Sequence, residues 1–170
     1  RKSVPVSNVV LEVLNTRGQC GPVYKAPIYP VVEGVDGCDG MYNHELYDSY
    51  SMSGYGIGSP ILISPVYNKD NSQRLQSNRV LMYHVGIDGT FGPKWYYRTL
   101  FTNTTHWGTY EDPFNQVQKV TSLLLEGSYR LGDAYSWNVG VSFGFDFNEG
   151  GLIGNNSGIM VTLSKKWKIL

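Results

Sequence analysis

Residues 135–148 read YSWNVGVSFGFDFN, and this stretch decides the predicted fold. Large apolar side chains occupy every odd-numbered position, and small or polar side chains occupy every even-numbered position. Such strict alternation places the two sets on opposite faces of a β-strand. Strands of soluble domains average about 5–6 residues, whereas a membrane-spanning strand needs about 9–11. We therefore predict a strand of a transmembrane β-barrel. A long strand of a soluble β-sandwich that binds glycans is the rival interpretation.

Five further segments alternate in the same way, at residues 6–15, 79–90, 95–106, 117–131 and 158–170. The connections at 91–94 and 132–133 are short, whereas those at 107–116 and 149–157 are longer. Barrels pair short periplasmic turns with longer extracellular loops, and all four connections fit that topology if the C-terminus is periplasmic. Lys165 interrupts the apolar face of the last segment, where its amine can reach a headgroup, and Trp167 is a near-terminal aromatic residue.

Six strands are too few to close a membrane barrel, since single-chain barrels have at least about 8 strands. An open edge in lipid would also leave backbone groups unpaired. We therefore expect these strands to be part of a larger barrel. The chain begins at Arg1 rather than at an initiator methionine, and we expect it to be a piece of a longer precursor.

Residues 16–77 separate the first predicted strand from the second and are rich in Gly, Pro, Tyr and Asn. Long loops without structure of their own are uncommon. We expect this insertion to fold over the barrel mouth or as a plug in the lumen, with Glu45–Ser53 and Ile61–Tyr67 as strands within it. Alternatively, these two segments form a further membrane hairpin. The insertion also holds Cys20 and Cys38, which either form a disulfide or remain free thiols.

Composition excludes several classes of protein. The 14 basic and 14 acidic residues cancel, so no basic patch points to nucleic acid. No run of 18 apolar residues exists, which excludes helical membrane spans but not a barrel, because alternation dilutes hydropathy.

Five segments along the chain carry a further signal when they are taken together and in order. They are NTRGQCGPVY at 15–24, YNHELYDSYSMSGYGIGSPILISPVYN at 42–68, HVGIDG at 84–89, WGTY at 107–110 and GGLIGNNSGIMVTLSK at 150–165. In this order and combination they resemble the C-terminal part of the capsule assembly family called Wzi. The resemblance implies that residues 1–170 are the C-terminal portion of an antiparallel, roughly 18-stranded barrel in the bacterial outer membrane. It also implies a lectin-like protein that holds capsular polysaccharide at the cell surface, with extracellular loops folded over the pore.

Carbohydrate binding uses flat aromatic rings, planar polar groups and, for acidic sugars, Arg or Lys. The predicted loops supply such residues, and our candidates for polysaccharide binding are Tyr42, Asn43, His44, Tyr47, His106, Trp107, Tyr110, Asn155 and Asn156. The alternative role of the aromatic residues is packing at the barrel rim or in the plug. The alternative role of the two asparagines in the last loop is turn geometry.

A second set of residues carries charges on the predicted inner face: Glu12, Arg98, Glu126, Arg130, Asp146 and Lys166. Mixed signs on neighbouring strands predict salt bridges that brace the lumen wall. The alternative is that these charges set the solute selectivity of an open diffusion channel.

Enzymatic chemistry has little support in the sequence. None of His44, His84 and His106 has a metal-ligand spacing, and no nucleophile-elbow motif or phosphate-binding loop occurs. We expect no catalytic residues, cofactor or metal. The expected partners are capsular polysaccharide, outer-membrane lipid and other outer-membrane proteins of a surface assembly.

Overall fold

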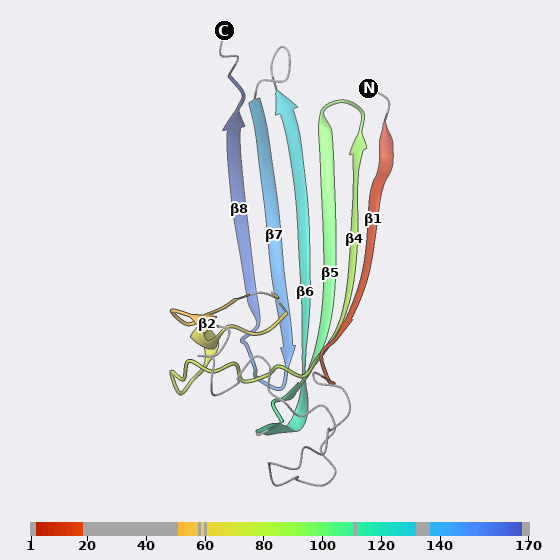
Figure 1. The fold of residues 1–170 in the computed structure, drawn as a ribbon. Coiled ribbons are helices and arrows are strands. Elements are labelled where there is room, and N and C mark those ends of the chain that lie inside the picture. The colour runs from red at the N-terminus through yellow and green to blue at the C-terminus, as the bar shows by residue number, and fades with distance from the viewer. Residues whose placement is uncertain are drawn as a thin grey trace.

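The structure, a computed structural model, describes residues 3–18, 51–57, 59, 61–110, 112–131 and 137–167. These residues form one antiparallel six-stranded sheet (Figure 1). Its strands, in order across the sheet, are β1 (Val4–Asn15), β4 (Val80–Phe91), β5 (Trp95–Gly108), β6 (Pro113–Leu131), β7 (Trp137–Glu149) and β8 (Asn156–Lys165). A small separate hairpin joins β2 (Ser51–Met52) to β3 (Tyr55–Gly56), and a 3₁₀ helix, η1, covers Pro65–Tyr67. The predicted antiparallel, all-β class is confirmed.

The sheet is open. Within the described residues, β1 and β8 are its two edges and do not pair with each other, so the strands do not close into a barrel. β1 starts and β8 ends at one end of the sheet, where the β4–β5 turn also lies (the top of Figure 1). β2 lies near the other end.

The register of the strands aligns the predicted alternation across the whole sheet. One row joins odd-numbered residues of all six strands, namely Val9, Ile87, Thr99, Leu125, Phe143 and Ile159. We call the face that carries these odd-numbered side chains the apolar face, and the face that carries the even-numbered side chains the polar face. The apolar face is open to its surroundings, since Leu11 is 73% exposed and Val161 is 68% exposed.

The described part of the insertion packs against the polar face. Ile61, Leu62 and Leu75 are buried with Val80 and Met82, which are even-numbered residues at the start of β4. This small core therefore lies on the side of the sheet opposite the apolar face. Burial is concentrated at one end of the sheet, beside the ends of β1 and β5.

The prediction of a strand over Ile61–Tyr67 is wrong. Its first two residues are both buried, and the segment ends in η1, with a proline at the start of that helix. A strand that buries one face would bury alternate residues, not adjacent ones. Pro65 also lacks the N–H that a sheet ladder requires and suits the first turn of a helix instead. For Glu45–Ser53, only residues 51–53 lie within the described residues.

The connection predicted at 107–116 is shorter than expected. β5 continues to Gly108 and β6 begins at Pro113, with a bulge after His106. The turn requires glycine at position 108, because its φ is +80° and an added Cβ would lie 2.6 Å from the carbonyl oxygen of Asp112. The β4–β5 connection at residues 92–94 is tight, as predicted, with Gly92 at φ +69°. At the C-terminal side, β8 ends at Lys165, so Trp167 follows the strand rather than ending it.

Candidate functional site

Two transverse rows of polar side chains cross the polar face, and the first contains an ion pair. Arg98 of β5 donates from Nε to Glu126 of β6, and Ser142 donates from Oγ to the other oxygen of the same carboxylate at 3.2 Å. At the β1 end of this row, Nδ2 of Asn8 donates to both carboxylate oxygens of Asp88, at 3.0 and 3.1 Å. These bonds tie neighbouring strands together at one level of the sheet.

The second row consists of Glu12, His84, Thr102, Ser122, Asp146 and Asn156. Nδ1 of His84 lies 2.7 Å from Oγ1 of Thr102, and Oγ of Ser122 donates to Asp146 Oδ1 at 2.6 Å. Since His84 and Ser122 bond to different partners, the row does not assemble a Ser–His–Asp relay.

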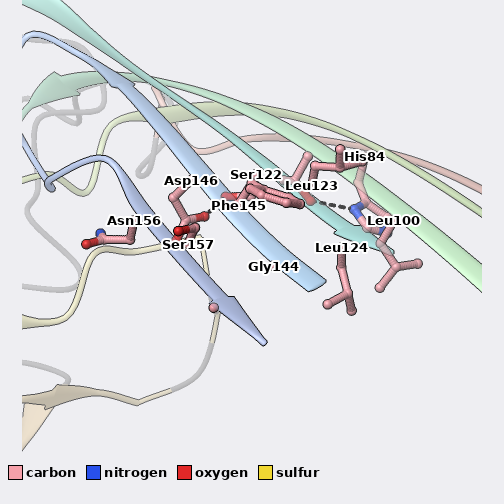
Figure 2. A pocket seen from close by; sticks show the side chains of 12 residues that line it. His84, Leu100, Ser122, Leu123, Leu124, Gly144, Phe145, Asp146, Asn156 and Ser157 are labelled. Atoms are coloured by element: carbon pink, nitrogen blue, oxygen red, sulfur yellow. Dashed lines mark hydrogen bonds between the residues drawn. The ribbon is translucent and has the colours of Figure 1, made fainter. Parts of the chain in front are cut away.

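A groove of about 460 Å³ runs beside this second row (Figure 2). Its polar lining residues are His84, Thr102, Ser122, Asp146, Asn156 and Ser157. Two glycines, Gly144 and Gly158, also line the groove, and a Cβ added at either position would meet no atom within 4 Å. Leu100 and Leu124 also line the groove, so its wall is largely apolar with a few polar groups along one row.

The remaining predicted charges of the polar face lie apart from that ion pair. Glu12 is exposed and faces His84 in the register, and Arg130 pairs in the register with Asn138. Lys166 is exposed beyond the end of β8. Among the described residues, the structure gives none of these three an ion-pair partner.

A cluster of two arginines and two aromatic rings lies where the insertion leaves and rejoins the sheet. The guanidinium carbon of Arg17 lies 4.5 Å from the ring centre of Trp107, and that of Arg79 lies 4.8 Å from the ring centre of Tyr110. Tyr110 also donates its hydroxyl to the carbonyl oxygen of Arg17. We call Arg17, Arg79, Trp107 and Tyr110 the arginine–aromatic cluster.

Of the four residues in this cluster, sequence reasoning singled out Trp107 and Tyr110 but missed the two arginines. Arg17 follows β1 and Arg79 precedes β4, at the two ends of a long insertion. Only the β1–β4 and β4–β5 pairings bring them together. The available signal was their position beside strand ends on the same side of the predicted membrane.

His106 is close to the cluster in sequence but not exposed beside it. The residue is fully buried, and its Nε2 lies 2.9 Å from Oγ1 of Thr104. A polymer outside the protein cannot reach a side chain with no exposed surface. His106 is therefore a buried residue of the sheet, and we no longer count it among the candidates for polysaccharide binding.

The two asparagines of the last loop make local bonds. Asn155 accepts from the backbone N–H of Asn148 at 2.8 Å, and Asn156 donates to the carbonyl of Gly154 at 2.9 Å. Gly150 and Gly151 both have positive φ. These contacts fit the turn-forming alternative. The other predicted residues, Tyr42, Asn43, His44, Tyr47, Cys20 and Cys38, lie outside the described residues.

At the opposite end of the sheet, one lysine lies between two tryptophans. The amine of Lys165 is 4.8 Å from the ring centre of Trp137 and 3.9 Å from that of Trp167. The predicted interruption of the apolar face is thus a cation–π contact. Nearby, the rings of Trp95 and Tyr129 pack with their centres 4.6 Å apart.

No family model, curated protein or solved structure matches this chain. Among the described residues, no helix has the length and apolar character to cross a membrane. The same residues contain no group of three or more His, Cys, Asp or Glu side chains placed to hold a metal ion.

Proposed function

We propose that the chain is part of an outer-membrane β-barrel that attaches or organises capsular polysaccharide at the bacterial cell surface, without enzymatic chemistry. The observation that carries this proposal is the asymmetry of the sheet. Apolar side chains cover one exposed face across six strands, while the insertion packs against the other face.

Lipid is the surrounding that this asymmetry favours. The strands have 10 to 19 residues, enough to cross a bilayer at a barrel tilt. Soluble monomers rarely expose an apolar patch larger than a few hundred Å². A soluble β-sandwich would cover such a face with a second sheet, and none packs there within the described residues.

Aromatic residues near both ends of the apolar face support a membrane setting. Trp95, Tyr129 and Trp137 lie toward the end with the β4–β5 turn, and Tyr83 and Phe147 lie toward the end with the insertion. Rings of this kind are enriched where hydrocarbon meets headgroups. With short turns facing the periplasm, the insertion and the arginine–aromatic cluster face the cell exterior.

The chemistry of the exterior end supports a polysaccharide as the partner. Aromatic rings, guanidinium groups and backbone carbonyls are the groups that recognise sugars and their acidic substituents. A polymer that repeats one sugar motif would engage many copies of the protein, so weak single contacts would still retain it.

The test is binding of the full-length, detergent-purified protein to capsular polysaccharide from its own host. We expect saturable binding that is weakened when Trp107 and Tyr110 are both replaced by alanine, with native strand content checked by circular dichroism. Binding unchanged by the double variant would move the site elsewhere on the protein. No binding by folded wild-type protein would contradict the proposed function.

A diffusion channel is the second candidate, favoured by the two polar rows. An open channel would conduct ions in a planar bilayer, whereas a barrel closed by its insertion would not. Steady conductance by wild-type protein, together with no polysaccharide binding, would favour the channel.

A further inference from the structure

We infer that the arginine–aromatic cluster is a carboxylate-binding subsite, which takes a uronic acid residue of an acidic polysaccharide. This inference rests on the proposed function and names the chemical class of its ligand. It goes beyond the aromatic candidates because it assigns recognition to Arg17 and Arg79.

The stacking geometry determines which groups are free to bind. Each guanidinium lies over a ring, at 4.5 Å for Arg17 on Trp107 and 4.8 Å for Arg79 on Tyr110. One face of each ring is therefore covered by a cation and is not free to stack on a sugar. A guanidinium group held over a ring still carries N–H donors that can bond to a ligand.

Those donors have no acceptors in the part of the chain that the structure describes. Each guanidinium carries five N–H donors, and neither forms a hydrogen bond or an ion pair with a described carboxylate. The Nε of Arg79 is buried and without a partner in the described residues. Arg79 as a whole is half-buried, so the part of its guanidinium that remains exposed, and not Nε, is the part that a ligand can reach.

The cluster is held in place by backbone bonds from three strands. Thr16 donates its N–H to the carbonyl of Val80 at 2.8 Å, which fixes the residue before Arg17. The N–H of Trp107 donates to the carbonyl of Arg79 at 3.0 Å, and the N–H of Arg79 donates to the carbonyl of Gly108 at 3.2 Å. Because the backbone of these residues is already fixed, little backbone conformational entropy is lost when a ligand binds.

Two positively charged side chains at this end of the sheet favour an anion over a neutral sugar. Tyr110 contacts the guanidinium of Arg79 through its ring and the backbone carbonyl of Arg17 through its hydroxyl, whereas the guanidinium of Arg17 lies over Trp107. A carboxylate matches the planar fork of a guanidinium with two parallel hydrogen bonds. The C–H groups of a pyranose ring can then rest against the remaining indole surface of Trp107.

The experiment uses full-length protein in detergent micelles and three small probes built on one pyranose ring: glucuronate, glucose and glucose 6-phosphate. Binding is measured by saturation-transfer NMR and titration. We expect glucuronate to bind at least about tenfold more tightly than glucose, since hydrogen bonds to charged groups are the stronger ones. The double substitution Arg17→Lys and Arg79→Lys keeps both charges but removes the paired N–H donors of the planar guanidinium groups. It should weaken glucuronate binding severalfold.

The matched control is Arg130→Lys, at the opposite end of the sheet, which should leave glucuronate binding unchanged. Circular dichroism shows whether each variant folds, and single substitutions at Arg17 and Arg79 replace the double variant if it does not fold. Equal binding of glucose and glucuronate would overturn the inference, and so would equal binding of glucose 6-phosphate.

A parallel assay separates this inference from the proposed function. Host capsular polysaccharide is compared with the same polymer after its carboxyl groups are reduced to alcohols. Equal binding of both polymers would overturn the carboxylate subsite and leave the proposed function standing. Binding of neither polymer would contradict the proposed function itself.

Discussion

Phe143 provides the sharpest test of whether the apolar face meets lipid. It is the middle residue of β7, which runs from Trp137 to Glu149, and its side chain lies on the apolar face. If the strand crosses a bilayer, Phe143 lies near the midplane. An arginine there costs about 2–4 kcal/mol, and this cost falls to about 0–1 kcal/mol near the interface.

The same strand supplies the matched control. Phe147 lies on the same face four residues farther along β7. With about 3.4 Å per residue and a tilt of about 40°, it lies about 10 Å from the midplane, close to the edge of an apolar band about 25 Å tall. Phe143→Arg should therefore destabilise the protein by about 2–3 kcal/mol more than Phe147→Arg.

The assay is equilibrium unfolding of the full-length protein in phospholipid vesicles, by denaturant titration with tryptophan fluorescence. Ser142→Arg, on the polar face beside Phe143, controls for the size and charge of arginine. Equal costs for Phe143→Arg and Phe147→Arg would refute the depth argument. A larger cost for Ser142→Arg than for Phe143→Arg would refute the assignment of the two faces.

Three further predictions concern the polar face, a turn and the insertion. The substitution Glu126→Gln leaves Arg98 without its charged partner. It should lower the free energy of unfolding by only about 1 kcal/mol, because the pair is partly exposed to solvent. A loss above about 3 kcal/mol, which is the scale of a broken buried pair, would contradict this expectation. Gly108→Ala should cost about 2 kcal/mol or more, since alanine is strained at φ +80° and its Cβ would crowd the Asp112 carbonyl. Gly127→Ala, which meets nothing within 4 Å, is the control and should be nearly neutral in the same denaturant titration. Leu75→Ala removes a side chain that is 1% exposed and should cost about 2–5 kcal/mol, confined to the insertion; limited proteolysis should then cut the insertion while the strands stay intact.

The six strands were predictable because each one carries its own signal. Alternation is a local property, and every position in residues 135–148 fits the same assignment: odd-numbered side chains on the apolar face and even-numbered side chains on the polar face. The strand ends were less certain. β5 and β6 extend into the predicted loop at 107–116, because hydrogen bonds between strands continue wherever the register allows. The local sequence pattern of one strand does not show how far this pairing continues.

The conformation of the insertion was harder to predict because it depends on contacts with residues that are distant in sequence. Ile61 and Leu62 look like part of a strand, yet both are buried against Val80 and Met82. Adjacent buried residues follow the shape of the surface that they cover, and that surface belongs to β4. The same holds for His106, whose loss of exposure depends on what packs around the end of β5.

The sequence by itself determined the all-β class, the antiparallel order and the two faces of the sheet, because period-2 alternation and short turns act over neighbouring residues. Only the tertiary structure decided which side chains share a site. Arg17 and Arg79 lie at opposite ends of the insertion, and strand pairing between β1, β4 and β5 brings both to Tyr110. The register of hydrogen bonds between strands fixes which residues lie beside one another across a sheet. The sequence of a single strand does not contain that register.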